Sequence, residues 1–404
     1  MRRGHILELL ALAELLGMSV WFSASALAPQ LRETWLLSAA ETGWLTSAVQ
    51  LGFVAGTATA ALLNLADIVP ARVYFAVSAL AAAACNAALL AAGGAASGGY
   101  ALALLSRVGT GFFLAGVYPP AMKMIATWYR DGRGFAIGTV VGALTVGKAT
   151  PFLVHGLEHA GIAPVVLVAS AATVTAALLV FAGYRDGPFP FERRPFAWGL
   201  VGVVVRCREV RLATSGYLGH MWELYAMWSW IAAFLAMGAG LSARGADLAA
   251  FAAIAAGGAG CVLGGVLADR VGRERLTIWA MALSGSCAAI IGLTSASPAL
   301  VVAVAVVWGF AVVADSAQFS ALVTELAPSH AVGTALTLQT SLGFLLTMAS
   351  IQLVPRLVDV VGWRWAFVAL AVGPTLGIGA MRRLARLRAR HGAGDADTSG
   401  AAAR

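Results

Sequence analysis

The feature that most constrains this chain is a run of about 20 apolar residues that recurs along it, with a short polar turn after each run. Of the 404 residues, 60% are hydrophobic and 11% are charged, whereas a soluble domain is about 25% charged. Water offers no way to hide so much apolar surface, so the chain is predicted to be a membrane protein with many spans. The runs are too long and too uniformly apolar for barrel strands, which leaves helices to satisfy the backbone in lipid.

We therefore predict an all-α polytopic membrane protein with twelve transmembrane helices in two six-helix halves. The first half is predicted at 1–184 and the second at 212–390, joined by a cytoplasmic linker at 185–211 with several prolines and arginines. Within the linker, 197–205 is apolar but too short to span, which favours an interfacial helix. The small, polar residues 391–404 predict a disordered tail. The predicted spans are Ile6–Ala28, Gly43–Leu63, Val73–Ala92, Tyr100–Met122, Gly134–Leu157, Ala163–Tyr184, Leu212–Met237, Leu248–Leu267, Leu276–Ser295, Ala299–Val323, Gly333–Val354 and Gly362–Met381.

The basic residues are distributed unevenly across these spans. About 21 of the 27 Lys and Arg residues fall on one side and about four on the other. Because basic residues accumulate on the cytoplasmic side, both termini are predicted to be cytoplasmic. The net charge of +8 reflects this asymmetry, so no nucleic-acid partner is predicted. The low lysine content, together with many Ala, Arg and Gly residues, favours the plasma membrane of a bacterium (its inner membrane) and a lipid bilayer as the surroundings.

A charged turn at 264–275 lies between two membrane-length apolar runs, so it must lie at a membrane face. It reads Gly-Gly-Val-Leu-Ala-Asp-Arg-Val-Gly-Arg-Glu-Arg. Its two leading glycines permit close helix packing, and Asp269 can accept hydrogen bonds from the first amides of a helix. In the first half, residues 64–72 repeat the Leu-Ala-Asp of the turn around Asp67, without the glycines and the first arginines.

This turn resembles the signature loop of the major facilitator superfamily, G-x-L-A-D-R-x-G-R, which lies after the second helix and often again after the eighth. The resemblance implies a secondary transporter whose two halves rock about a central small-molecule site, and a monomer is the simplest transporting unit. It also implies that the turn helps to lock one state of the transport cycle. The residues to which we assign this gating role are Gly265, Asp269, Arg270, Gly272 and Arg273, with Asp67 as their degraded counterpart.

Ionisable side chains inside a membrane are costly, so each is a candidate for function. Arg107 opens the segment 107–111, which resembles a second motif of the same family, R-x-x-x-G, whose arginine is linked to proton transfer. Lys148 is predicted near the midplane of its helix. We assign both to substrate binding, and a structural ion pair is the alternative for each. Trp21 and Tyr118 are candidate cavity aromatics, with lipid-facing packing as their alternative.

Four further groups are candidates for proton coupling. Glu223 and His220 share one face of the span at 212–237, and Glu223 is predicted close to the midplane, which makes it the first choice for a protonation site. His220 could instead be a packed histidine. Glu14 and Asp315 could each pair with a cation across a cavity.

Together these residues predict a symporter that moves a small organic or inorganic anion with H⁺. Proton/drug antiport is the alternative, because Gly138, Gly142 and Gly147 partly match the helix motif of that branch, although its proline is missing. A nitrate transporter is disfavoured because the predicted second and eighth helices contain no arginine. A membrane enzyme or a receptor is disfavoured because no nucleophile–base pair is visible. The four cysteines are interpreted as packing residues, so no metal or cofactor is predicted.

Overall fold

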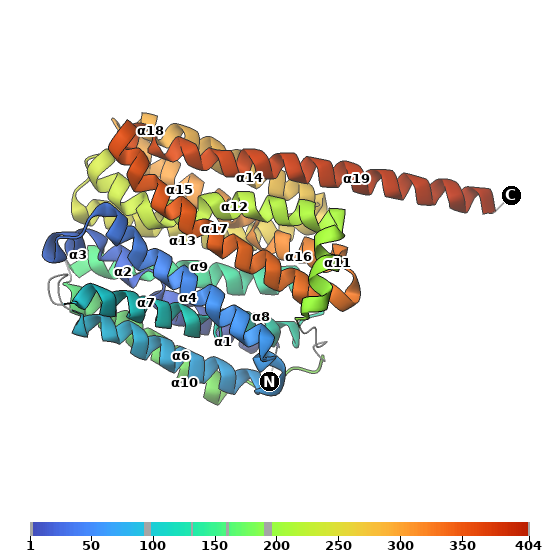
Figure 1. Cartoon of the computed structure of the whole chain (residues 1–404), viewed down its shortest axis with the longest axis horizontal. Helices are drawn as coiled ribbons and strands as arrows, with labels where there is room; N and C mark the ends of the chain where they lie inside the picture. The colour runs from blue at the N-terminus through green and yellow to red at the C-terminus, as the bar shows by residue number, and fades with distance from the viewer. Residues whose placement is uncertain (1–2, 93–97, 131, 159–160, 190–195, 403–404) are drawn as a thin grey trace.

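The computed structural model describes residues 3–92, 98–130, 132–158, 161–189 and 196–402. Within these ranges the side chains of residues 66, 67, 158 and 391–402 are not described. Every regular element in this part of the chain is a helix (Figure 1). The helices of the first half, drawn in blue to green, gather on one side of the molecule, and those of the second half lie on the other.

The first half contains six successive helical segments, several of them interrupted. Its elements are α1 (Arg3–Gly17), η1 (Met18–Val20), α2 (Ser23–Ala26), α3 (Ala28–Trp35), α4 (Ala39–Leu62), α5 (Leu65–Ile68), α6 (Ala71–Ala87), η2 (Ala88–Ala91), α7 (Gly99–Leu114), α8 (Tyr118–Ala126), α9 (Arg133–Glu158) and α10 (Ile162–Gly183). The second half has a similar succession of helices. Its elements are η4 (Trp198–Leu200), α11 (Val201–Arg206), α12 (Arg208–Ala233), η5 (Phe234–Gly238), α13 (Ala243–Val271), α14 (Arg273–Ile290), η6 (Ile291–Thr294), α15 (Pro298–Ala314), α16 (Ser316–Leu326), η7 (Ser329–Ala331), α17 (Val332–Val361), α18 (Trp363–Ala366), η8 (Phe367–Ala371) and α19 (Val372–Ala402).

Ten helices among the described residues are long and apolar enough to cross a membrane. Two further segments, α1 to α2 and α12, occupy the places of the first and seventh predicted spans. The first is broken into short pieces, and the second carries a histidine, a glutamate and many aromatic residues that lower its hydropathy. The fold is therefore consistent with the twelve predicted helices. The domain boundaries at 184, 212 and 390 stay predictions, and the backbone of α19 is helical as far as Ala402, where the sequence favours a disordered tail.

The first predicted span is interrupted, which corrects the expectation of one continuous helix over 6–28. The α-helical hydrogen bonding stops at Gly17 and resumes at Ser23. Side-chain hydroxyls compete for the carbonyls near the break: Ser19 Oγ donates to Leu16 O at 2.7 Å and to Ala169 O at 3.1 Å. The chain can therefore bend here in the middle of the membrane.

Two other predicted spans are interrupted for identifiable reasons. The predicted span Tyr100–Met122 divides into α7 and α8 just before Pro119 and Pro120, which have no N–H to donate. The predicted span Ala299–Val323 divides into α15 and α16 at Asp315. The short helix predicted within the linker is present as η4 and α11.

The two halves meet along α9 and α13, where small residues bring the backbones together. A Cβ placed on Gly142 would lie 2.7 Å from Gly258 O, and one on Gly138 would lie 3.0 Å from Cys261 O. Van der Waals contact at such a crossing requires small residues, as is usual for helices in lipid. A second contact between the halves joins α4 to α17, so both sides of the central region are lined by closely packed pairs.

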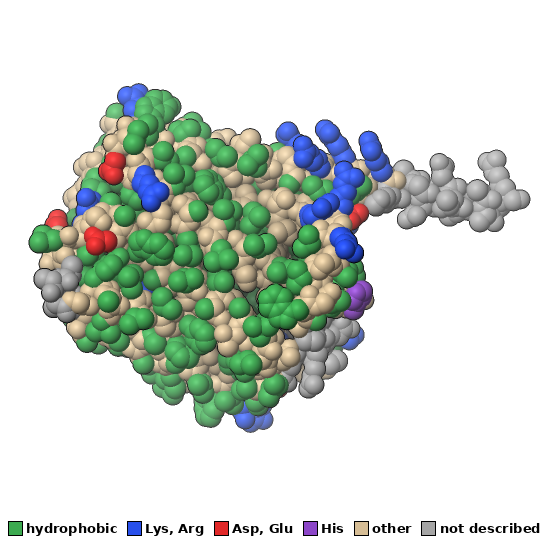
Figure 2. Space-filling view, viewed as in Figure 1, with side chains coloured by type: hydrophobic (Ala, Val, Ile, Leu, Met, Phe, Trp, Pro, Cys, Tyr) green, Lys and Arg blue, Asp and Glu red, His purple; other side chains and the backbone are tan. Residues whose placement is uncertain are grey.

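The surface agrees with a membrane-embedded body. In Figure 2, apolar side chains cover the middle of the visible face, and Lys and Arg side chains gather at the end from which α19 emerges. Large exposed hydrophobic residues such as Leu105, Leu178 and Leu376 lie on different helices around the molecule. Such a continuous apolar surface is unusual in water and fits a lipid environment.

Candidate functional site

Lys148 lies at the centre of the molecule, on α9, with only 3% of its surface exposed. Its Nζ donates a hydrogen bond to the hydroxyl of Tyr225 at 2.6 Å. The same nitrogen lies 4.0 Å from the ring centroid of Trp21, 4.9 Å from that of Tyr225 and 5.4 Å from that of Trp228. An ammonium over aromatic faces is held by cation–π attraction, which strengthens when water is excluded. We call Lys148 with these three rings the lysine cage.

The lysine cage belongs to a larger aromatic cluster that joins the two halves. Phe53 of α4 lies 5.2 Å from Trp21 and 4.6 Å from Phe344 of α17, measured between ring centroids. Tyr225 of α12 lies 5.8 Å from Trp21 and 5.3 Å from Phe344. All these rings are buried. The halves are therefore closed around Lys148 in this structure, as expected of an occluded site.

Glu14 lies beside this cage on α1 and is fully buried. Neither carboxylate oxygen has a hydrogen-bond partner in the described part of the chain. Lys148 is near enough to act on Glu14 electrostatically, although its ammonium donates to Tyr225 and forms no ion pair with Glu14 among the described residues. The helix crossing explains this proximity, because a Cβ placed on Gly147 would lie only 2.1 Å from Leu15 O, so α1 and α9 touch where the two charged residues stand.

Two donors near Lys148 also have no partner. The indole Nε1 atoms of Trp21 and Trp228 are buried and make no hydrogen bond within the described residues. An ammonium group and two indole N–H groups give this region an excess of donors. A donor-rich site lined by rings suits a ligand that has a negatively charged head and an apolar body.

Arg107 is placed differently from the sequence-based assignment to substrate binding. It is fully buried, and its guanidinium donates to Val20 O (3.0 Å), Ser23 Oγ (3.1 Å), Asn86 Oδ1 (2.8 Å) and the carbonyl oxygen of Trp21. These acceptors surround the break between α1 and α2. Arg107 thus satisfies carbonyls that the interrupted helix leaves without partners. Its hydrogen bond to the carbonyl oxygen of Trp21 links it to the backbone of the lysine cage.

The other predicted proton-coupling residues form a separate cluster inside the second half. Glu223 accepts hydrogen bonds from Ser284 Oγ at 2.8 Å and from Trp308 Nε1 at 2.7 Å. His220 Nδ1 lies 2.8 Å from Asp315 Oδ1, close enough for an ion pair although not aligned as a hydrogen bond. Tyr118 begins α8 and interacts electrostatically with Glu14, so it belongs with the first group.

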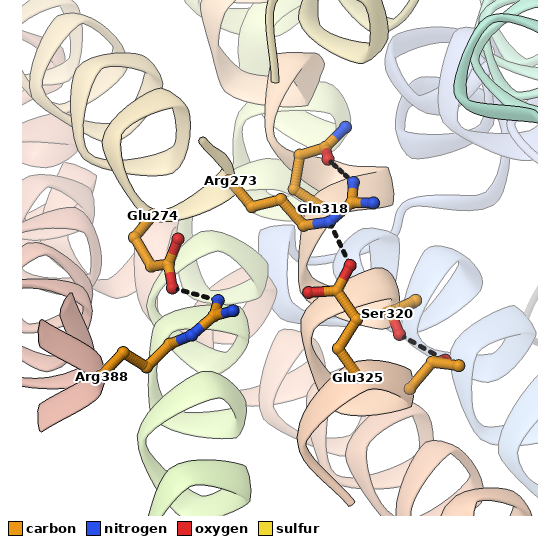
Figure 3. A network of polar contacts seen from close by, with 7 residues as sticks. Arg273, Glu274, Gln318, Ser320, Glu325 and Arg388 are labelled. Atoms are coloured by element: carbon orange, nitrogen blue, oxygen red, sulfur yellow. Dashed lines mark hydrogen bonds and ion pairs between the residues drawn. The ribbon is translucent and has the colours of Figure 1, made fainter. Parts of the chain in front are cut away.

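The signature turn lies at one end of the bundle, far along α13 from the cage. Gly272 has φ +91°, a conformation that favours glycine, and it separates α13 from α14. Arg273 donates to Glu325 Oε1 at 2.7 Å and to Gln318 Oε1 at 2.6 Å, and Arg388 donates to Glu274 at 2.6 Å (Figure 3). These contacts tie the turn to α16 and α19 of its own half.

The remaining gating residues differ in what they contact. A Cβ on Gly134, at the start of α9, would lie 3.1 Å from Asp269 Oδ2, so this carboxylate reaches the first half at a helix N-terminus. A Cβ on Gly265 would lie 3.0 Å from Gly134 O. Arg270 is exposed. Asp67 falls in α5, and its side chain lies outside the described residues.

Sequence reasoning missed several residues that the fold brings together. Tyr225 and Phe344 come from distant helices of the second half, and nothing in their local sequence marks them as partners of a lysine on α9. An ion pair between His155 Nδ1 and Asp247 Oδ2, at 2.7 Å, also joins α9 to α13 across the halves. The available sequence signal was that His155 and Asp247 both fall at or next to the predicted outer end of a span.

Comparison with known proteins agrees with this architecture. The sequence model described as Major Facilitator Superfamily matches residues 10–351 and 240–400. No curated protein sequence matches the chain. A bacterial homolog of the human lysosomal transporter Spinster, in an inward-facing and unoccupied conformation, superposes with a TM-score of 0.71 at 18% identity, covering 95% of this chain and 97% of that one.

Two further solved structures share the fold. The human organic anion transporter MFSD10 (TETRAN) has a TM-score of 0.71 at 14% identity, covering 94% of this chain and 100% of that one. A mutant of the nucleoside transporter NupG has a TM-score of 0.70 at 14% identity, covering 94% and 99%. The fold and the buried central site thus define a multi-pass membrane protein of the transporter class. The chain belongs to the Major Facilitator Superfamily, which confirms the family and fold class predicted from the signature turn.

Proposed function

We propose that this protein is a secondary active transporter that carries a small organic anion together with protons by alternating access. The observation that supports this most strongly is Lys148, a buried cation at the contact between the two halves. Among the buried side chains that the structure describes, Lys148 and Arg107 are the lysine and arginine side chains, and Arg107 already donates to four protein acceptors. Lys148 is thus the cation that can bind a substrate.

The surroundings of Lys148 favour an anion with an apolar or aromatic body. Trp21, Tyr225 and Trp228 offer ring faces, and the two unpartnered indole N–H groups can donate to a carboxylate or a sulfonate. A small inorganic anion such as nitrate would leave most of this aromatic surface without a partner. The proposed substrate is therefore an organic monoanion, with a monomer as the transporting unit in the bacterial plasma membrane and both termini in the cytoplasm.

One observation favours a second candidate, proton/drug antiport. The aromatic cluster of Phe53, Phe344 and the cage rings is typical of sites for lipophilic cations. A cation of this kind would, however, have to bind beside the ammonium of Lys148. Repulsion between two like charges in a dry site is strong, so the anion is the better match.

Uptake into proteoliposomes tests this proposal. We would compare benzenesulfonate, lactate and nitrate with the inside kept alkaline, and tetraphenylphosphonium with the inside kept acidic as antiport requires, using protein-free liposomes to correct for leakage. Uptake of benzenesulfonate that depends on the pH gradient and is lost in Lys148→Gln is the expected result. The matched control is Lys123→Gln, at the only other lysine of the chain, which should transport normally.

Two results would contradict the proposal. Movement of tetraphenylphosphonium alone, unaffected by Lys148→Gln, would favour drug antiport. Binding of an anion without any accumulation in sealed vesicles would favour a receptor or an enzyme on the same scaffold.

A further inference from the structure

Four carboxylates are buried among the described residues, and Glu14 differs from the other three. Glu223 accepts two hydrogen bonds, Asp247 pairs with His155, and Asp315 pairs with His220. Glu14 is fully buried and has no hydrogen-bond partner at either oxygen within the described residues. A buried carboxylate without donors is unfavourable unless a nearby cation compensates its charge or a proton neutralises it.

We propose that Glu14 carries the coupled proton, and that its ionised form blocks anion binding by neutralising Lys148. Uptake of a proton by Glu14 leaves Lys148 with an uncompensated positive charge, and the substrate anion then binds to Lys148 in place of the Glu14 carboxylate. This inference rests on the proposed transport of anions. It assigns the coupling to a single pair of residues at the same site.

The geometry of the helix crossing keeps the two groups together. Gly147 lets α9 touch the backbone of α1 at Leu15, and Glu14 and Lys148 are the sequence neighbours of these two contact residues. Thr173 of α10 donates to Leu16 O and Gly17 O, both at 3.3 Å, which helps to fix this turn of α1. These contacts keep the backbones at Glu14 and Lys148 close together in this structure, next to the break that follows Gly17.

The other titratable groups near this pair are uncharged in their ordinary state at pH 7. They are Tyr118 of α8, Tyr217 and Tyr225 of α12, and Cys261 of α13. None of them supplies a second permanent charge. The described charges that the substrate meets are therefore one cation and one carboxyl group.

The charge balance then fixes the stoichiometry. Without substrate, Lys148 and ionised Glu14 sum to zero. With substrate, Lys148, protonated Glu14 and a monoanion also sum to zero. Both forms can thus be enclosed between the halves without burying a net charge, which would be costly in a low-dielectric interior. One proton accompanies each monoanion, and transport is electroneutral.

Binding measured against pH tests this inference on the purified full chain. Benzenesulfonate is the probe because it stays ionised across the range from about pH 5.5 to about pH 8.5, so any pH dependence comes from the protein. Tryptophan fluorescence reports binding, since Trp21 and Trp228 lie in the cage. In the wild type we expect the affinity to fall by up to about tenfold for each pH unit as Glu14 ionises, because binding then takes up one proton.

Glu14→Gln should bind benzenesulfonate more tightly than the wild type at the alkaline end, and its affinity should fall less steeply as the pH rises. Glu223→Gln is the matched control and should follow the wild-type pH dependence. A Glu14→Gln protein whose affinity falls with pH as steeply as that of the wild type would overturn the assignment. So would a wild-type affinity that is independent of pH.

Proton counting in weakly buffered solution keeps the inference testable if Glu14→Gln does not fold. Binding of benzenesulfonate should then take up about one proton in the alkaline part of the range, for the wild type and for Glu223→Gln alike. A count of zero would refute the role of Glu14 even if binding is strong. Absence of binding at any pH, or equal binding by Lys148→Gln, would instead refute the proposed anion transport itself.

Discussion

Each half of this transporter buries one glutamate within a span, and the two glutamates differ in their surroundings. Glu223 is held by Ser284 and Trp308, so both of its oxygens are satisfied. Glu14 has only the charge of Lys148 to compensate it. A carboxylate with fixed donors stays in one protonation state, whereas a carboxylate compensated by a single nearby cation can change its protonation when an anion binds to that cation. Equal burial therefore does not imply equal function.

The largest effect that would sharpen this comparison is expected for Lys148→Gln. Removing the cation leaves Glu14 buried without compensation, which costs about 3 kcal/mol when it is ionised. We expect a lower thermal unfolding temperature at alkaline pH and loss of anion uptake. The double variant Glu14→Gln/Lys148→Gln should regain most of the unfolding temperature but no uptake. A double variant as unstable as the single one would show that the two residues are not a pair.

A second test concerns Arg107, which sequence reasoning placed with Lys148 in the substrate site. Arg107→Lys keeps the positive charge but loses the planar group that reaches four acceptors around the break after α1. We expect a loss of about 2 kcal/mol in the free energy of unfolding, from one or two charged hydrogen bonds. Thermal unfolding with and without benzenesulfonate would measure this. If the Arg107→Lys protein is stable but no longer binds the anion, Arg107 is a substrate-binding residue and the structural role proposed for it is wrong.

A third and smaller effect is expected at Glu223. Glu223→Leu leaves Trp308 Nε1 without its acceptor, at a cost of about 1 kcal/mol, whereas Ser284 Oγ can still donate to Met281 O. Glu223→Gln keeps an oxygen for one donor and should cost less than Glu223→Leu. Both variants should retain proton-driven uptake. If the Glu223→Gln protein folds but its uptake no longer depends on pH, the coupled proton is carried by Glu223 in the second half and not by Glu14.

The smallest effect is expected at the signature turn. Asp269→Asn removes a negative charge at the N-terminus of α9, a contact worth about 0.5–1 kcal/mol, so turnover should change by about two- to fivefold with insertion intact. Glu274→Gln is the control, because the partner of Glu274 is Arg388 in the same half. Initial uptake rates normalised to reconstituted protein would measure both. Unchanged turnover in Asp269→Asn would exclude a gating role for this contact.

The fold could be predicted from the sequence because it depends on local properties. The length and apolar composition of the hydrophobic runs predict membrane-spanning helices, and the turn at 264–275 identifies the family. The break in the first span was missed because it depends on Ser19 reaching Ala169 and on Arg107 reaching Val20, which are contacts between distant segments. Hydropathy alone carries no information about such contacts.

The site could be predicted only in part. Lys148, Glu14 and Trp21 were singled out as candidates because charge or an indole ring stands out inside an apolar run. The sequence did not show that Arg107 and Glu223 are satisfied by protein partners, because the depth of a residue along its helix does not say which hydrogen-bonding groups face its side chain. Tyr225 and Phe344 belong to the other half, so their contact with the cage exists only once the halves have packed.

The most direct measurement of the proposed coupling is benzenesulfonate uptake into proteoliposomes that contain an internal pH indicator, with the membrane voltage set by a potassium gradient and valinomycin. Coupling through Glu14 and Lys148 predicts that about one proton enters with each anion and that uptake does not respond to voltage. Uptake that follows the imposed voltage without acidification of the interior would show that the anion crosses with its charge uncompensated, and would contradict the coupling.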